Sequence, residues 1–358
     1  MKRILVVNTV PYVLGGISTV IMNYYEQIDC NQFHLDFVVN DYIEPIYREI
    51  MEKRGSAIYE VKRNSSPWAY CISLIKLIKK KHYEIVYVHG NSCTMAVDLF
   101  AAMLGGCRKR IAHVHNSMCQ HIVVHKVLRP LFELCCTERV ACSQAAGQWL
   151  FGKKKYVILP NGIDVEKYKY CLYVRNTVRK KLGLENKFIV GHVGFFNEQK
   201  NHKRLFAIFQ KLLMQNENSH LLCIAGDENI PDKYQRMIEK LNIATNVTIL
   251  TQRTDVNNLL MAMDVFVFPS LYEGLGVSVI EAQASGLPCI VSDRIPQEAN
   301  VTNTLRYVSL QATNDEWIEN INLACAERLD RCAYNERMLG GIFDINANGN
   351  RMQQLFEC

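Results

Sequence analysis

A glycine-containing turn between an apolar strand and a helix is the part of this sequence best suited to chemistry on an anionic ligand. The run VFVF (265–268) is followed by Pro269, by the turn EGLG (273–276), and by a helix predicted to begin near Val277. Glycine lets the backbone approach a ligand closely, and the N–H groups of a first helical turn attract anions with the help of the helix dipole. The segment 264–293 therefore predicts an anion site suited to a diphosphate.

Two carboxylates bracket this turn. Glu273 begins it, and Glu281 lies eight residues further on, inside the predicted helix. At the rise of a helix these residues are at most roughly 12 Å apart, which suits two groups that hold opposite ends of one elongated ligand. A lone pair of glutamates at this spacing is more often structural, but the glycine turn and the strand that ends at Asp293 favour the binding interpretation.

Other strand ends carry further candidate residues. Gly15 and Gly16 lie in the first strand-to-helix loop, before a helix predicted to start near Ile17, and they would allow a ligand close to the backbone or form a plain tight turn. His113 and His115 follow another strand, and alternation puts both on one face. One of them is expected to reach the ligand and the other to pack.

Several familiar motifs are absent from the sequence. No G-x-G-x-x-G follows the first strand, so a dinucleotide fingerprint is missing. No C-x-x-C pair supports a zinc ribbon or a thioredoxin site. No D-x-D pair supports a metal-bridged diphosphate, so we predict a site that needs no metal.

Short apolar runs alternate with helical segments along the whole chain. The first series of strands is predicted at 4–8, 37–39, 85–90, 110–116 and 139–143, and the second at 156–162, 188–194, 221–226, 247–250, 265–270 and 288–293. Helices are predicted at 17–27, 67–81, 202–215, 232–240, 256–263 and 277–285. This alternation predicts an α/β protein with two doubly wound, Rossmann-like domains, in which ligands bind beyond the carboxyl ends of the strands.

The domain boundary is predicted within 162–187, where periodicity lapses after the Asn161-Gly162 turn. We assign residues 1–165 to a first domain and residues 166–344 to a second, ligand-binding domain. The tail 345–358 is predicted to be helical, and it either caps the second domain or crosses back to the first. Ser143 and Asp255 are expected to cap the helices that follow them.

Charge and composition indicate the partners and the compartment to expect for the protein. The 358 residues carry a net charge of +6, and residues 1–165 hold 20 Lys/Arg against 13 Asp/Glu. Basic clusters of this kind are usually solvated faces, but they would also attract an anionic membrane. A pI of about 8.6 without a recognition motif speaks against nucleic acid. The apolar surroundings of most of the 14 cysteines and the lack of a targeting segment predict a cytoplasmic protein.

The segment 264–293 closely resembles the donor-binding region of family 4 glycosyltransferases, which are retaining enzymes of the GT-B fold, and especially those of capsular and exopolysaccharide synthesis. The other matching segments are PYVLGGISTV (11–20), RIAHVHNS (110–117), ACSQAAGQWLFG (141–152), LPNGID (159–164) and GHVGFFNEQKNHKRL (191–205). The order and the spacing of these segments make the resemblance specific, and it covers most of the chain.

The resemblance implies roles for individual residues. It implies that Glu273, Lys200 and His115 are catalytic: Glu273 beside the reacting carbon, Lys200 at the departing diphosphate and His115 against the donor sugar. The donor-binding residues that it implies are Gly274, Leu275, Gly276 and Val277 at the phosphates, Glu281 at the ribose and Arg253 beside the base. It places Gly15 and Gly16 at the floor of the cleft, near the acceptor or the donor phosphates, and it implies that the first domain, residues 1–165, is the acceptor side.

The chain departs from the family at one catalytic position. The family usually has an arginine directly after the VG pair at 193–194, where this chain has Phe195. Lys200 therefore has less help in neutralising the diphosphate, a charge that grows in the transition state. Lys203 or Arg204 could take the place of the missing arginine.

The resemblance also implies a reaction and partners. The expected reaction moves a sugar, without metal or other cofactor, from a nucleotide-sugar donor to a glycan or polyprenyl-diphosphate-linked acceptor in surface polysaccharide synthesis. The expected place is the cytoplasm, with peripheral contact to the inner face of an anionic membrane. Two alternatives stay open, namely another GT-B enzyme such as a nucleotide-sugar epimerase and a non-catalytic protein that binds nucleotide sugars. The residues do not separate front-face transfer from double displacement.

Overall fold

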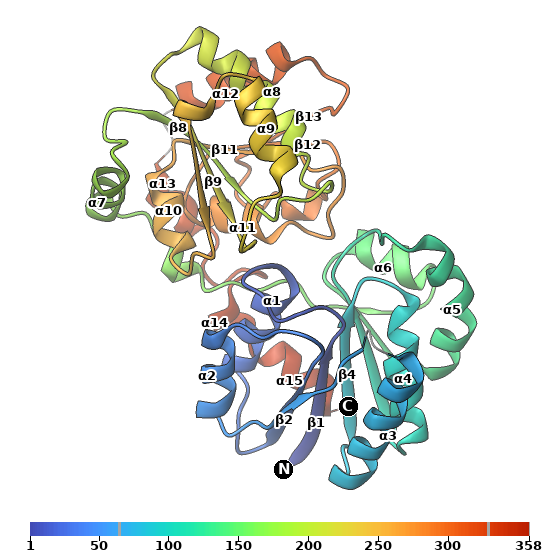
Figure 1. The fold of residues 1–358 in the computed structure, drawn as a ribbon. Helices are drawn as coiled ribbons and strands as arrows, with labels where there is room; N and C mark the ends of the chain where they lie inside the picture. Colours follow the sequence, from blue (N-terminus) through green and yellow to red (C-terminus); the bar gives the residue numbers. More distant parts are fainter. Residues whose placement is uncertain (64–65, 328–329, 358) are drawn as a thin grey trace. The chain divides into compact units, whose positions relative to one another are not determined.

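The chain folds into two compact α/β units (Figure 1). The computed structural model describes residues 1–63, 66–327 and 330–357. The first unit comprises Met1–Gly162 and the C-terminal segment from Asn348, and the second comprises Ile163–Ala347. Each unit contains one sheet of parallel strands with helices in the connections, which is the architecture that the alternating sequence pattern predicts.

The first unit is built on a seven-stranded sheet of order β3-β2-β1-β4-β5-β6-β7. Its strands are β1 (Lys2–Asn8), β2 (Phe33–Val39), β3 (Ile58–Glu60), β4 (Ile85–Gly90), β5 (Lys109–Val114), β6 (Glu138–Ala141) and β7 (Val157–Ile158). The helices are α1 (Gly16–Glu26), α2 (Pro45–Lys53), α3 (Pro67–Lys81), α4 (Ala96–Leu104), α5 (Ile122–Cys135) and α6 (Gln144–Phe151). Ser143 caps α6 as predicted, because its hydroxyl accepts a hydrogen bond from the Ala146 N–H at 3.2 Å.

Strand β7 corrects one prediction. The run 156–162 was expected to open the second series of strands, but Val157 pairs with Val140 of β6 in the first sheet. A strand–helix–strand pattern looks the same in the sequence whether its second strand returns to the same sheet or starts a new one. Here α6 crosses back, and the chain enters the second unit after Gly162.

The second unit is built on a six-stranded sheet of order β10-β9-β8-β11-β12-β13. Its strands are β8 (Phe188–Val193), β9 (Ser219–Ala225), β10 (Val247–Thr251), β11 (Val265–Phe268), β12 (Cys289–Ser292) and β13 (Leu305–Val308). Its helices are α7 (Leu172–Leu182), α8 (His202–Gln215), α9 (Asp232–Lys240), α10 (Val256–Ala262), α11 (Val277–Ala284), α12 (Asn314–Ala326) and α13 (Arg331–Glu336). Because β8 and β11 are neighbours, the loops that follow them lie at the same edge of the sheet.

Helix α7 lies in the interval where the sequence periodicity lapses, so the sequence did not predict it. Arg179 is the only buried residue of α7. Ion pairs, and not an apolar stripe, attach this helix to the sheet. The Asp264 carboxylate accepts hydrogen bonds from Arg175 at 2.5 Å, from Arg179 at 2.6 Å and from the Ile189 N–H at 2.7 Å.

Strand β13 is a further difference from the sequence prediction, in which 288–293 is the last strand.

We expect Asp264→Asn to lower the free energy of unfolding of the second unit by about 2–4 kcal/mol. The substitution leaves two largely buried guanidinium groups without a counter-charge, and partial exposure reduces the cost below that of a fully buried pair. Urea unfolding followed by fluorescence would measure it, since Trp317 lies in the core of this unit. Asp315→Asn is the control, because it removes an exposed ion pair with Lys211 that is expected to contribute less than about 1 kcal/mol. Equal effects of the two substitutions would contradict the prediction.

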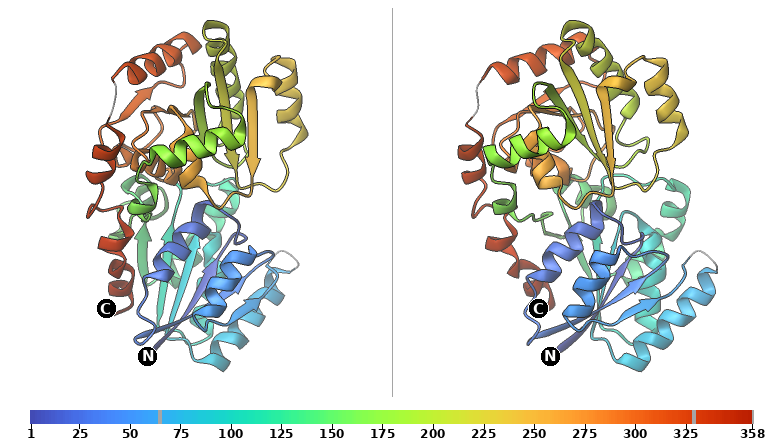
Figure 2. Two further views of the ribbon diagram at one scale, coloured as in Figure 1. Left: turned by 90° about the vertical axis from the view of Figure 1, so that its left-hand side faces the viewer. Right: turned by 60° about the vertical axis from the view of Figure 1, so that its left-hand side comes forward.

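The C-terminal segment returns to the first unit (Figure 2). The predicted tail 345–358 contains two short helices, α14 (Ile345–Asn348) and α15 (Asn350–Glu357), and Cys358 lies outside the described residues. Phe356 packs against Phe33 and Tyr87, with ring centroids 5.6 and 5.7 Å away, and Lys2 donates a hydrogen bond to the Phe356 carbonyl at 2.8 Å. The tail therefore crosses back, which was one of the two predicted arrangements. Within the described ranges, no helix has the length and hydropathy to cross a membrane.

Candidate functional site

The glycine turn lies between β11 and α11, and α11 begins at Val277 as predicted. Gly276 occupies the N-cap position with φ of 83°, in the left-handed region that a side chain disfavours. No side chain caps this helix, so the positive end of its dipole faces the turn. Leu275 is buried and fixes the turn to the core. The turn thus has the geometry of an anion site.

Lys200 and Glu273 meet at this turn, although 73 residues separate them in the chain. The Lys200 ammonium donates a hydrogen bond to Glu273 Oε1 at 2.7 Å, and the two side chains are only 14% and 7% exposed. The ammonium also lies 4.6 Å from the centre of the Phe268 ring. A cation held in such a poorly solvated place acts strongly on nearby negative charge.

One backbone hydrogen bond and two hydrogen bonds from side-chain amides to backbone carbonyls hold the two loops together. The Leu271 N–H donates to the Gln199 carbonyl at 2.8 Å, and the Gln199 amide donates to the Tyr272 carbonyl at 3.0 Å. The Asn201 amide, from the same loop, donates to the Pro269 carbonyl at 3.1 Å. The position of Lys200 beside Glu273 therefore follows from adjacent strands and interlocked loops.

Glu281 lies on α11 and is buried. Burial raises the pKa of its carboxyl to about 7, and a 2.8 Å hydrogen bond donated by the Tyr168 hydroxyl opposes that shift. Tyr168 ends the short 3₁₀ helix Val165–Tyr168, which precedes α7. No sequence pattern indicates a role for Tyr168, because it falls where the periodicity lapses.

Arg253 lies apart from the glycine turn in the sheet order. It follows β10, which is separated from β11 by β9 and β8. Its guanidinium binds the Asp255 carboxylate through two hydrogen bonds of 2.6 and 2.7 Å. Asp255 occupies the N-cap position of α10 but makes no side-chain capping bond, which corrects the predicted cap.

The two basic residues near Phe195 that could replace the missing arginine, Lys203 and Arg204, have other surroundings. Arg204 donates to the Ala312 carbonyl, and Lys203 is exposed on the first turn of α8. The Phe196 N–H donates to Asp227 at 2.8 Å, which fixes the loop. Lys200 is the residue that the structure shows in an ion pair with Glu273.

Gly15 and Gly16 open α1 in the first unit. Their φ values are 98° and 57°, so both have backbone conformations that favour glycine. The Gly15 N–H donates to the Thr19 hydroxyl at 3.0 Å, and a Cβ on Gly16 would meet open space. Backbone conformation, and not a close neighbour, explains the glycine at position 16.

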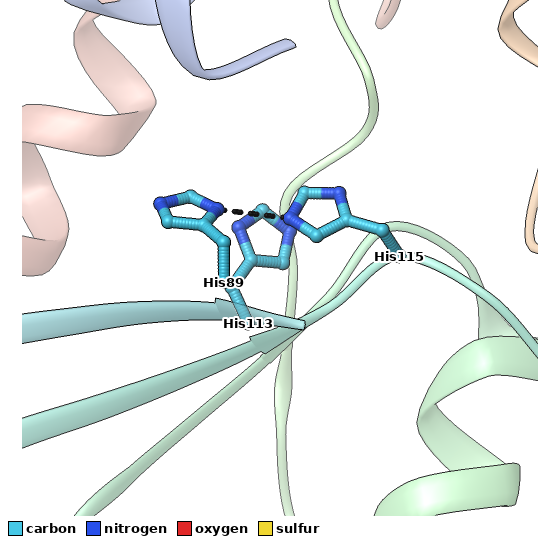
Figure 3. A group of neighbouring side chains, drawn as sticks. All are labelled: His89, His113 and His115. Carbon is cyan, nitrogen blue, oxygen red and sulfur yellow. Dashed lines mark hydrogen bonds between the residues drawn. The ribbon is translucent and has the colours of Figure 1, made fainter. Parts of the chain in front are cut away.

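His115 has both ring nitrogens engaged inside the first unit, and Figure 3 shows the bond to His89. Its Nε2 lies 2.9 Å from Nδ1 of His89, and its Nδ1 lies 3.4 Å from Oδ1 of Asn161. Burial lowers the pKa of His115 to about 4, against the opposing effect of the Asn161 bond. His113 packs beneath it and bonds to the Tyr87 hydroxyl at 2.7 Å. The sequence did not indicate a role for His89 or Asn161 at this site, although His89 lies near the carboxyl end of the predicted strand 85–90.

Two family models match successive parts of the chain. The model described as Glycosyltransferase Family 4 matches residues 14–167, and the model described as Glycosyl transferases group 1 matches residues 174–337. The putative glycosyltransferase EpsF of Bacillus subtilis (strain 168) is 30% identical over 328 residues, which cover 87% of this chain and 85% of EpsF.

Two further proteins extend the comparison. An Escherichia coli protein named UDP-Gal:alpha-D-GlcNAc-diphosphoundecaprenol alpha-1,3-galactosyltransferase is 31% identical over 307 residues, which cover 78% of this chain and 76% of that protein. The crystal structure of Anabaena HepE in complex with UDP-glucose has the same fold, with a TM-score of 0.81 and 14% identity over the whole of both chains. The chain belongs to the family 4 glycosyltransferases and has their GT-B fold.

Proposed function

We propose that this glycosyltransferase transfers a hexose with retention from a nucleotide-sugar donor that binds at the glycine turn of the second unit. The observation that carries the proposal is the buried Lys200–Glu273 pair beside the uncapped N-terminus of α11. An ammonium group and a helix N-terminus together suit a diphosphate, and the neighbouring carboxylate suits a sugar that develops positive charge.

In the proposed reaction, the bond from the anomeric carbon to the donor phosphate breaks and a bond to the acceptor oxygen forms. The acceptor proton goes to the departing diphosphate, whose negative charge Lys200 and the N–H groups of α11 offset. Glu273 either stabilises the sugar cation in a front-face route or adds to the anomeric carbon in a double displacement. Mass spectrometry of the quenched enzyme separates the two routes, because only the second leaves a sugar on Glu273.

A thermal-shift screen with a panel of nucleotide sugars tests the donor. A true donor at 100 times its dissociation constant should stabilise the protein by about 2.7 kcal/mol. NMR of the product then reports its anomeric configuration, and inversion would overturn the proposal. Incubation with donor alone tests the epimerase alternative, which requires an isomerised sugar. Binding without any turnover would support the non-catalytic alternative.

The proposed reaction needs no metal ion, because Lys200 and the helix N-terminus supply the positive charge at the diphosphate. We expect full turnover in excess chelator. Loss of turnover that magnesium or manganese restores would contradict this part of the proposal.

The proposed donor site makes nucleotide binding depend on pH. We expect the dissociation constant of a UDP-sugar to fall about tenfold between pH 6 and pH 8, because the ionised Glu281 carboxylate accepts hydrogen bonds from the ribose more strongly than the acid does. Calorimetric titration across this range measures the change. Glu281→Gln should bind more weakly and without the pH dependence, and a variant that kept the wild-type profile would assign the titration to another group.

The Glu281 carboxyl also makes the stability of the fold depend on pH, in the direction opposite to nucleotide binding. Its pKa of about 7 in the folded protein lies above the ordinary value of 4.5, so the folded protein binds more protons than the unfolded chain between these values. The contribution of Glu281 to the free energy of unfolding is therefore present in full below about pH 4.5 and is lost as the pH rises through 7. Glu281→Gln should remove this slope.

We further propose that the acceptor is lipid-linked, in surface polysaccharide synthesis, and that the first unit binds the inner face of an anionic membrane. The E. coli relative is named for a diphosphoundecaprenol-linked acceptor. Helix α5 has a solvent-exposed stripe of Val123, Val127 and Leu134, which are 74%, 71% and 68% exposed. An apolar stripe on a helix whose other face is already packed suits the boundary of a bilayer.

Basic residues flank this stripe. Lys126 is exposed on α5, and Lys154 pairs with Glu133 at 2.6 Å, which holds the lysine run 153–155 beside the helix. Each basic residue near an anionic surface contributes about 1 kcal/mol. The stripe and its basic flank thus match a bilayer of anionic lipids.

Sedimentation with vesicles that contain phosphatidylserine tests this surface. The triple variant Val123→Ser, Val127→Ser and Leu134→Ser should lose most vesicle binding. The control exchanges Leu172, Met214 and Leu323, three exposed apolar residues of the second unit, for serine. Equal binding by the two variants, or binding that does not depend on salt, would contradict the proposed surface.

A further inference from the structure

Three buried histidines of the first unit converge on one another (Figure 3). His89 is the penultimate residue of β4 and lies opposite His113 in the register of β4 with β5, and His115 follows directly after the end of β5. One ring nitrogen from each of the three lies within 4.8 Å of the other two. The sheet register, and not a sequence motif, brings these imidazoles together, and we refer to His89, His113 and His115 as the histidine trio.

In two of the three rings, the Nδ1 atom has a hydrogen-bond partner outside the trio. Nδ1 of His115 faces Oδ1 of Asn161, and Nδ1 of His113 bonds to the Tyr87 hydroxyl. A hydrogen bond of this kind fixes the tautomer and orientation of a metal-binding histidine. Among the described residues, the Nε2 atoms of His113 and His89 are both buried without a hydrogen-bond partner, which is costly for a polar atom unless something binds it.

We propose that the histidine trio binds a transition-metal ion such as Zn²⁺, Co²⁺ or Ni²⁺. Three imidazoles form a set that these ions prefer and that Mg²⁺ and Ca²⁺ do not. The fourth position of a tetrahedral ion is left for water or another ligand. His115, at the carboxyl end of β5, is the most exposed of the three and gives the side from which an ion enters.

The geometry of the trio allows two states. Nδ1 of His89 and Nε2 of His115 are 2.9 Å apart and share a hydrogen bond. Two nitrogens on a tetrahedral zinc ion are about 3.3 Å apart, as bond lengths of about 2.0–2.1 Å require. Small rotations of the rings, with the shared proton moved to the outer nitrogen of His89, therefore convert the hydrogen-bonded pair into two metal ligands.

Metal binding has a consequence for transfer that rests on the proposed function. The loaded trio holds His115 as a ligand, so His115 cannot reach a donor sugar. We therefore expect Zn²⁺ to inhibit transfer and a chelator to restore it. This site differs from a metal bridge at the donor diphosphate, which the proposed reaction does not use.

Direct binding to the full chain tests the site. Chelator-treated protein is titrated with Co²⁺, whose visible absorption reports a nitrogen-bound tetrahedral ion, and with Zn²⁺ by calorimetry. We expect one tightly bound, nitrogen-coordinated ion per chain, apart from any ion held at thiols, and we expect His89→Asn and His113→Asn each to weaken its binding on the order of 100-fold or more. His121→Asn, an exposed histidine outside the trio, is the matched control and should bind as the wild type does.

The variants separate the trio from other ligands. The chain has 14 cysteines, of which Cys30 and Cys171 are exposed, so some Zn²⁺ binding at thiols is expected in every variant. Circular dichroism and the melting temperature of each metal-free variant show whether it folds, and Asn161→Ala offers a milder change with an expected loss of about 10–100-fold. Binding that is absent in the wild type, or equal in wild type and all folded trio variants, would overturn the proposal. Failure of nucleotide-sugar binding would overturn the proposed function and leave this result unaffected.

Discussion

Lys200→Met should lower the rate of sugar transfer about 10²–10³-fold, which is the usual loss when one preorganised charge is removed from a transition state. Methionine keeps the length of the side chain and its packing against Phe268, and it removes the charge. The substitution breaks the ion pair with Glu273, so the melting temperature of the variant is measured alongside its kinetics. Steady-state kinetics at saturating donor measures the effect on kcat.

Two further variants sharpen this test. Lys203→Met removes an exposed lysine three residues away on the first turn of α8 and should leave kcat within about twofold, as surface changes usually do. Lys200→Arg keeps the charge in a different geometry and should recover part of the rate. If Lys200→Met and Lys203→Met had the same kcat, the role of Lys200 at the departing diphosphate would be wrong.

Glu273→Gln should also lower kcat by about 10²–10³-fold, while the affinity for the free nucleoside diphosphate changes little. Glutamine has the size of glutamate and can still accept the hydrogen bond from Lys200, but it carries no charge to stabilise the developing sugar cation. The distinction between kcat and nucleotide affinity is informative, because a purely structural role would weaken both. Glu239→Gln on α9, an exposed position, is the control.

The two residues should not act independently. They share a hydrogen bond of 2.7 Å, and residues in direct contact usually show coupled effects. We expect the double variant Lys200→Met and Glu273→Gln to be within about tenfold of the slower single variant. Fully multiplicative losses would indicate that the pair seen in the structure is not the unit that acts on the donor.

The sequence by itself determined the local elements of this protein. The helices 67–81, 202–215 and 232–240 have the predicted bounds, and α11 begins at Val277. These features depend on hydrophobic periodicity, on Pro at a helix start and on glycine at a left-handed turn, and all of these act between residues close in the chain. The alternation of strands and helices likewise predicted two parallel sheets.

Only the tertiary structure decided which distant residues meet. The order of strands puts β8 beside β11 and so brings Lys200 to Glu273, and the register of β4 with β5 assembles the histidine trio. Tyr168 reaches Glu281 from a segment without periodicity, and helix α7 is attached through Asp264 and two arginines. Sheet order and ion pairs depend on contacts between residues far apart in the chain. A pattern of apolar residues shows only that each strand is buried, and it carries no information about which strand lies beside it.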